Sequence, residues 1–162
     1  MKRSVYVETS IVSYLGGWLH PKDLLVAANQ RLTRDWWNGP RRLFDLFASA
    51  IVVDEAMKGD AARASERLLA IAEMTMLDVT PAARNLASDL LSQTRIPRKA
   101  EIDALHIAIA AIHGMDYLLT WNCTHIANGI ILPQVYEVCR VSGYEPPLIC
   151  TPQELFEESL DA

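Results

Sequence analysis

The feature that most constrains this chain is a regular alternation of short apolar runs with longer segments of helical periodicity. Short runs rich in β-branched and aromatic residues predict strands, whereas apolar residues at helical spacing predict amphipathic helices. Strands that alternate with helices favour a parallel sheet covered on both faces, so we expect an α/β fold. The expected strands span residues 4–7, 50–53, 76–79, 117–120 and 148–150.

Several helix ends carry recognisable signals. Thr80 followed by Pro81 combines a favoured N-cap residue with a favoured first helical residue. Gly114 is a residue type that commonly ends a helix. The expected helices span 9–15, 24–37, 40–47, 61–74, 81–93, 99–113 and 129–142, and a short last helix begins at residue 152.

Length and composition predict one globular domain over residues 1–162. With 51% hydrophobic and 22% charged residues, the chain can bury enough apolar surface to offset the entropy of ordering. No apolar run approaches the ~20 residues that a membrane-spanning helix needs. Glu8 follows the first basic residues too closely for a signal-peptide core. We therefore expect a cytoplasmic protein that does not enter a membrane.

Charge and cysteine content narrow the function only slightly. A net charge of −5 argues against a protein that coats nucleic acid nonspecifically, but it allows an enzyme that binds a few phosphates locally. The three cysteines form no CxxC pair, which favours reduced thiols and argues against a zinc site. The function must therefore be inferred from particular side chains.

Oxygen-bearing side chains follow three of the expected strands at the point where each strand ends. Because the carboxyl ends of parallel strands meet at one edge of a sheet, and ligands bind there, we expect these side chains to lie close together. The set is Glu8, Thr9 and Ser10 after 4–7, Asp54 and Glu55 after 50–53, and Asn122 after 117–120.

A further carboxylate, Asp103, lies in the first turn of the expected helix 99–113, on a face that is otherwise apolar. Taken singly, each of these residues has an ordinary structural explanation. Glu8 suits a helix cap, Asp103 suits a helix dipole, and Asn122 suits a turn. The functional interpretation rests on one geometric rule that gathers all of them at one end of one sheet.

Clustered carboxylates predict a site for Mg²⁺ or Mn²⁺. Hard divalent ions prefer oxygen ligands, and a bound cation relieves the repulsion between neighbouring acids. Such an ion can polarise a phosphoryl oxygen and activate water. The hydroxyls of Thr9 and Ser10 are suited to orient that water or to support a ligand carboxylate.

The chain resembles the PIN-domain family, and within it the VapC-like ribonuclease toxins of type II toxin–antitoxin systems. The matching segments are VYVETSIVSYL, IVVDEAMKGD, EIDALHIAIAAIHGMDYLLTWNCTHIAN and GYEPPLICTPQEL. The resemblance implies a three-layer α/β/α fold with a central, mostly parallel sheet. It also implies an acidic pocket that binds Mg²⁺ or Mn²⁺ and hydrolyses RNA phosphodiester bonds.

The resemblance assigns roles to individual residues. Glu8, Glu55 and Asp103 match the family's metal-binding acids, while Asn122 and Thr9 join them as catalytic candidates. Two positions depart from the family pattern, because Glu8 and Asn122 stand where the family usually has aspartates. Three carboxylates instead of four favour one well-held metal ion over two.

Other residues and partners follow with less support from the sequence. Arg98 and Lys99 immediately precede the helix of Asp103, so they are candidate substrate contacts together with Ser10. His106 and His125 are expected to be packing and turn residues, since Mg²⁺ prefers oxygen ligands. The resemblance implies an RNA substrate, a cognate antitoxin protein and a homodimer.

Two alternatives remain open. The departures at Glu8 and Asn122 favour a catalytically weak or inactive PIN-like module that binds RNA or a protein partner. A phosphatase-like or other Mg²⁺ hydrolase on a similar sheet is disfavoured, because the first strand is followed by no motif for a covalent aspartyl nucleophile.

Overall fold

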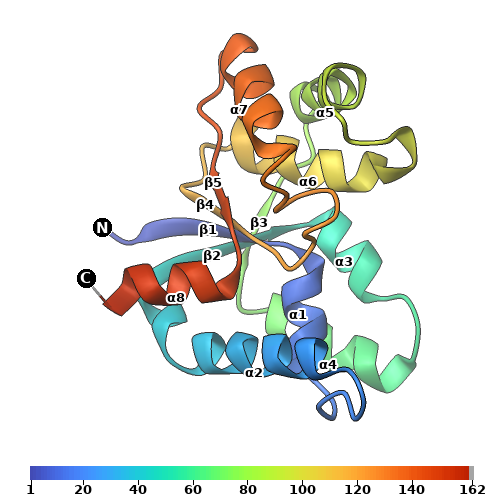
Figure 1. The fold of residues 1–162 in the computed structure, drawn as a ribbon, viewed down its shortest axis with the longest axis vertical. Helices are drawn as coiled ribbons and strands as arrows, with labels where there is room; N and C mark the ends of the chain where they lie inside the picture. The colour runs from blue at the N-terminus through green and yellow to red at the C-terminus, as the bar shows by residue number, and fades with distance from the viewer. Residues whose placement is uncertain (161–162) are drawn as a thin grey trace.

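The structure of this chain, a computed structural model, describes residues 1–160 and the side chains of residues 1–156. Within these residues, five strands form one sheet in the order β3-β2-β1-β4-β5, and every neighbouring pair is parallel (Figure 1). The strands are β1 (Arg3–Val7), β2 (Phe44–Ser49), β3 (Thr75–Leu77), β4 (Tyr117–Leu119) and β5 (Leu148–Cys150).

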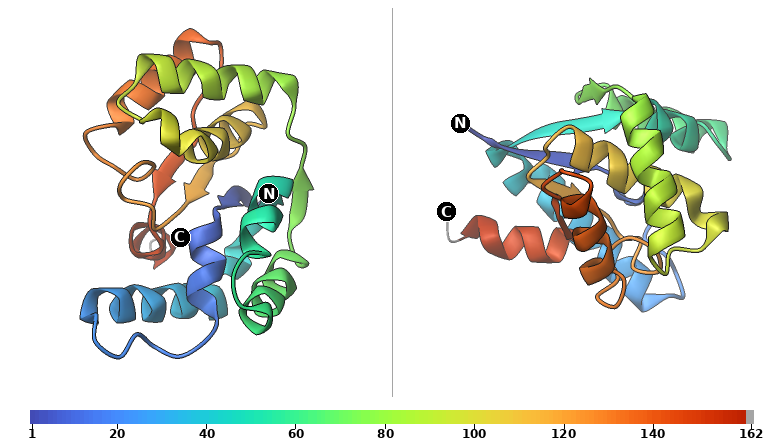
Figure 2. Two further views of the ribbon diagram at one scale, coloured as in Figure 1. Left: turned by 90° about the vertical axis from the view of Figure 1, so that its right-hand side faces the viewer. Right: turned by 90° about the horizontal axis from the view of Figure 1, so that it is seen from above.

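Helices cover both faces of this sheet (Figures 1 and 2). One face carries α5 (Pro81–Gln93), α6 (Glu101–Ile112) and α7 (Leu132–Val141). The other carries α1 (Thr9–Leu15), α2 (Leu24–Asn38), α3 (Ala50–Ala56), α4 (Ala61–Ile71) and α8 (Pro152–Leu160). Two 3-10 helices, η1 (Pro40–Leu43) and η2 (Arg98–Ala100), complete the described elements. The expected three-layer α/β/α fold is confirmed, and the sheet is parallel throughout.

β1 lies at the centre of the sheet, where Val5 pairs with Leu46 on one side and with Tyr117 on the other. Its residues Val5, Tyr6 and Val7 are fully buried. A strand with helices above and below has no solvent face, which explains why this run is apolar without polar alternation. Its carboxyl end therefore delivers the next residue, Glu8, directly to the edge of the core.

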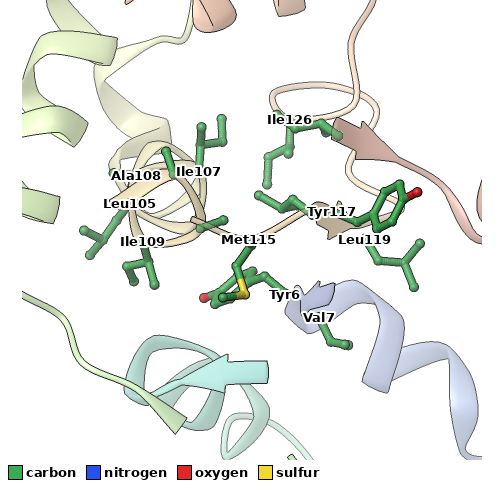
Figure 3. Packing of buried hydrophobic residues seen from close by; sticks show 14 of the residues in the cluster. Tyr6, Val7, Leu105, Ile107, Ala108, Ile109, Met115, Tyr117, Leu119 and Ile126 are labelled. Carbon is green, nitrogen blue, oxygen red and sulfur yellow. The ribbon is translucent and has the colours of Figure 1, made fainter. Parts of the chain in front are cut away.

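α6 is the most deeply buried helix, because every residue from 104 to 111 is buried. Figure 3 shows Ile109 of this helix near Tyr6 of β1, whereas Leu105 points to the other side of the helix. Each fully buried aliphatic side chain contributes roughly 1.5–3 kcal/mol relative to an exposed one. This burial fixes the helix that carries Asp103 near its start. None of the described helices is both long and apolar enough to cross a membrane.

The segment from 40 to 53 was predicted wrongly. The expected helix 40–47 is instead η1 followed by β2, and the expected strand 50–53 belongs to α3. β-branched residues from 51 to 53 favour a strand by propensity. Val52 and Ala56, however, lie four residues apart on one helical face and are both fully buried. Packing of that face outweighs local propensity.

Most other boundaries were close to those expected. α5 spans the predicted residues, and the Thr80 side chain accepts a hydrogen bond from Ala83 N at 3.1 Å, as an N-cap should. The expected helix 99–113 is shorter, because its first turn is η2. The strand expected at 76–79 begins one residue earlier and ends at Leu77.

Candidate functional site

Glu8 lies at the junction of β1 and α1 and has two structural functions there. Its Oε2 accepts a hydrogen bond from Ser10 N at 2.6 Å, which caps the helix, and its own backbone N donates to Leu119 O at 3.1 Å. The residue is only 5% exposed. Burial raises the pKa of the Glu8 carboxyl, an effect that the nearby His106 and the Ser10 hydrogen bond oppose.

Glu55 lies near the end of α3, the helix that follows β2, and not directly after a strand as expected. Its Oε1 accepts hydrogen bonds from Thr9 Oγ1 at 2.7 Å and from His106 Nε2 at 2.6 Å. Burial by itself would raise the pKa of Glu55. The hydrogen bond and charge of His106, the Thr9 hydrogen bond and the charge of Lys58 outweigh it and hold that pKa below its usual range. Glu55 is therefore ionised at neutral pH.

His106 lies in α6, is fully buried, and joins Glu55 to the centre of the sheet. Its Nδ1 is 2.8 Å from the hydroxyl of Tyr6, and that hydroxyl is 2.8 Å from Ser49 Oγ. Burial raises the pKa of the Tyr6 phenol, so the phenol keeps its proton. A continuous hydrogen-bonded chain thus runs from Ser49 through Tyr6 and His106 to Glu55.

Asp103 pairs with a second histidine, which comes from the loop after β4. His125 Nδ1 lies 3.0 Å from Asp103 Oδ2, and their side chains are 23% and 20% exposed, respectively. Asn122 Oδ1 accepts a hydrogen bond from the backbone N of His125 at 3.0 Å. Asn122 therefore closes the turn that presents His125 to Asp103.

The candidate substrate residues occupy different environments. Ser10 Oγ accepts a hydrogen bond from Trp121 N at 2.8 Å, which ties the start of α1 to the end of β4. Arg98 and Lys99 lie in η2 immediately before α6, and both are exposed. Neither forms a salt bridge with another residue in the described part of the chain.

The structure brings the candidate residues together as two hydrogen-bonded groups. One joins Glu55 to Thr9 and His106, with Glu8 close enough for its charge to interact with both Glu55 and His106. The other joins Asp103 to His125 and, through the turn, to Asn122. Asp54, which was expected to accompany Glu55, is exposed and takes part in neither group.

The donor chemistry of these groups fits a hard divalent ion, because they supply three carboxylates: Glu8 after β1, Glu55 in α3 and Asp103 in α6. In the side-chain positions described here, however, no three His, Cys, Asp or Glu groups converge in an arrangement that could hold a metal ion. Each acid instead has a histidine or backbone partner. Binding of one cation by all three acids therefore requires some of these side chains to move.

Sequence reasoning missed the buried chain behind Glu55. His106 was expected to be a packing residue, but both of its ring nitrogens lie within hydrogen-bonding distance of a partner. Two signals were present in the sequence. Tyr6 lies two residues before Glu8, so strand alternation puts both on one side of β1, and His106 lies one helical turn after Asp103.

Comparisons with known proteins agree with this architecture. A family model of the PIN domain matches residues 5–122. Among solved structures, the Mycobacterium tuberculosis toxin VapC20, described as cleaving the sarcin–ricin loop, superposes with a TM-score of 0.57 at 17% identity. That match covers 78% of this chain and 96% of VapC20. At this identity the similarity shows a shared fold.

Rickettsia felis VapBC2, solved bound to a DNA fragment from its promoter, gives a TM-score of 0.49 at 12% identity. That match covers 91% of this chain and 98% of the matched chain. A search of curated proteins gave no match.

Proposed function

This chain belongs to the PIN domain family, and from that premise we propose that it is a metal-dependent ribonuclease that hydrolyses RNA phosphodiester bonds. The observation that supports the proposal is that the acids lie around the carboxyl ends of two neighbouring strands. Glu8 follows β1 directly and interacts with the charge of Glu55, while Asp103 contacts His125 in the loop after β4. VapC20, which shares the fold, is described as a toxin that cleaves the sarcin–ricin loop. We therefore also propose that this protein is the toxin of a toxin–antitoxin pair.

The proposed metal ligands are Glu8, Glu55 and Asp103, and the ion is Mg²⁺ or Mn²⁺. When bound, such an ion polarises the phosphoryl oxygen and lowers the pKa of an attacking water. Glu55 is already ionised and hence ready to bind a cation. Glu8 is buried with a raised pKa, and a nearby cation would favour its charged form.

The remaining catalytic candidates act through these acids. The Thr9 hydroxyl donates to Glu55 Oε1 and so fixes the orientation of that carboxylate. Asn122 holds the turn of His125, which in turn contacts Asp103. Asn122, which lacks the charge of an aspartate, is thus proposed to position His125 beside Asp103.

RNA is proposed to approach along the side of the sheet where α6 begins. Arg98 and Lys99 are exposed there and carry no salt bridge among the described residues, so their charges are free to contact phosphates. Ser10 is less open to substrate because its oxygen already accepts a backbone hydrogen bond. We further propose a cytoplasmic homodimer that is inhibited by a cognate antitoxin protein.

One observation favours a second candidate function, a catalytically weak or inactive PIN-like module that binds RNA or a protein partner. Each proposed ligand carboxylate already has a hydrogen-bond partner within the protein. In these positions the carboxylates do not converge on one point, so a shared ion must move at least one of them away from its contact, which weakens metal binding.

A cleavage assay tests the proposed activity. Purified protein is incubated with an unstructured RNA and Mn²⁺, Mg²⁺ or EDTA, alongside the variants Asp103→Asn and Asp116→Asn. Residues that merely support metal ligands affect activity about 10–100-fold, so loss of a ligand charge should reduce cleavage by about 100-fold or more. Asp116 precedes β4 at the opposite end of the sheet, so its variant is the matched control.

The proposal predicts metal-dependent cleavage that Asp103→Asn loses and Asp116→Asn retains. Intact RNA under every condition, together with RNA binding, would favour the inactive module. Equal cleavage by both variants and the wild type would contradict the assigned site.

A further inference from the structure

His106, the fully buried histidine of α6, contacts the proposed metal ligand Glu55 but has no function in the proposed site so far. His106 is 0% exposed, and both ring nitrogens have polar partners at 2.6–2.8 Å. Burying a polar ring costs free energy unless its nitrogens form hydrogen bonds, so both contacts offset the cost of burying His106. Packing alone would be served by an aliphatic residue, like the isoleucines beside it.

The chemistry of the partners fixes the direction of the hydrogen bond to Glu55. A carboxylate oxygen accepts hydrogen bonds, so Nε2 of His106, 2.6 Å from Glu55 Oε1, carries the proton and donates. This holds whether the imidazole is neutral or charged. In the neutral ring Nδ1 then accepts from the Tyr6 hydroxyl, and Ser49 donates to the Tyr6 oxygen.

The two hydrogen bonds to Glu55 converge on the same atom. Thr9 Oγ1 and His106 Nε2 both donate to Oε1, at 2.7 and 2.6 Å. Oε2 receives no hydrogen bond from any residue that the structure describes, and the Glu55 side chain is 32% exposed. The carboxylate is thus held by one oxygen, while the other is left for a different ligand.

We propose that His106 is a positioning residue, whose Nε2–H, oriented by Tyr6 and Ser49, holds Oε1 of Glu55 so that Oε2 is available to a divalent cation. The inference deepens the proposed function and rests on it. Support of this kind pre-organises a ligand, because the side chain does not have to be ordered when the ion binds.

Two substitutions of His106 distinguish a function in positioning Glu55 from a function in core packing. The side-chain amide of His106→Gln puts a donor near the place of Nε2, whereas the shorter His106→Asn puts one near Nδ1 and cannot reach Glu55. Mn²⁺ binding to the full chain is measured by titration calorimetry. We expect His106→Gln to stay near the wild-type affinity and His106→Asn to bind about 10–100-fold more weakly.

A matched control lies on the same helical segment. His113 caps the far end of α6 and contacts the Asp78 carbonyl, so His113→Asn should leave the Mn²⁺ affinity unchanged. Equal affinities of the two His106 variants, whether both normal or both weak, overturn the proposal. If His106→Asn does not fold, Tyr6→Phe replaces it, since it removes only the hydroxyl that orients the ring. A weaker Mn²⁺ affinity is then expected, and an unchanged affinity overturns the proposal.

A metal-free readout separates this inference from the proposed function. In nuclear magnetic resonance spectra of the metal-free protein, the Nε2 proton of His106 should exchange slowly with water, and Glu55→Ala should remove that protection. If the wild type neither binds Mn²⁺ nor cleaves RNA, the ribonuclease proposal fails while this spectrum still reports on the contact. Absence of a protected Nε2 proton in the wild type overturns the positioning function itself.

Discussion

At the scale of single residues, Glu8 combines two functions that oppose each other energetically. Its carboxylate caps α1 through Ser10 N, which is stabilising. Its burial disfavours the charged form and raises its pKa. A carboxylate buried in this way lowers the stability of the metal-free protein, and a bound cation would relieve that cost.

This conflict predicts a pH effect on folding. Between the ordinary carboxyl pKa of 4.5 and the higher value in the fold, the native state binds more protons at Glu8 than the unfolded state. Stability from this group is therefore lost as pH rises through that window. Glu55, whose pKa is lowered, contributes stability above 4.5 that is lost only as pH falls below it.

Glu8→Gln should consequently raise the free energy of unfolding at neutral pH in EDTA. The amide oxygen can still cap α1, but no charge is buried. Urea unfolding from about pH 5 to 8 measures the effect, and the advantage of the variant should grow with pH. A variant less stable than the wild type across this range would contradict the assigned cost of burying Glu8.

Some site residues were predictable from the sequence and others were not. Glu8 and Asp103 follow from strand ends and helix starts, which are local features. The pairing of His106 with Glu55 joins residues 51 positions apart, and that of His125 with Asp103 joins residues 22 positions apart. Such contacts form only when separate elements pack together. Local patterns could place His106 one turn after Asp103 but could not identify Glu55 as its partner.

At the scale of elements, α6 connects the core to the site. It packs against α5 and β4, with Ile109 near Tyr6 of β1 (Figure 3), and its first turn carries Asp103. Ile109→Ala should destabilise the protein by about 2–5 kcal/mol, because the side chain is fully buried and leaves a cavity. Ile102→Ala is the control on the same helix. That side chain is 38% exposed, so a much smaller effect is expected in denaturant unfolding. Comparable losses for both variants would contradict the packing of α6.

Elements with strong end signals were predicted well, whereas those defined by tertiary packing were not. α5 has both a capping Thr80 and Pro81, and its predicted span is confirmed. β2 lies largely where a helix was predicted, and α3 includes the residues predicted as a strand, because the β-branched run at 51–53 is helical. The error mattered for the site, since it placed Glu55 directly after a strand instead of within α3.

At the scale of the whole molecule, both layers of helices pack on the same sheet. We therefore propose that residues 1–162 fold as one domain. This predicts a single cooperative unfolding transition that is the same by circular dichroism and by tryptophan fluorescence. Two separated transitions would contradict it.

Metal binding should stabilise that same transition. At a Mn²⁺ concentration about 100 times Kd, binding to the native state alone contributes about 2.7 kcal/mol. Thermal unfolding with and without Mn²⁺ measures this shift, and Asp103→Asn should abolish most of it. An equal shift in both proteins would indicate Mn²⁺ binding elsewhere.

The central claim, that Glu8, Glu55 and Asp103 share one divalent ion, is tested most directly by the crystal structure of the protein grown with Mn²⁺. Anomalous diffraction locates the ion without assumptions about the ligands. The account predicts one strong peak bonded to carboxylate oxygens of Glu8, Glu55 and Asp103. A Mn²⁺ peak bound elsewhere, or no peak while these acids keep their histidine and backbone partners, would contradict it.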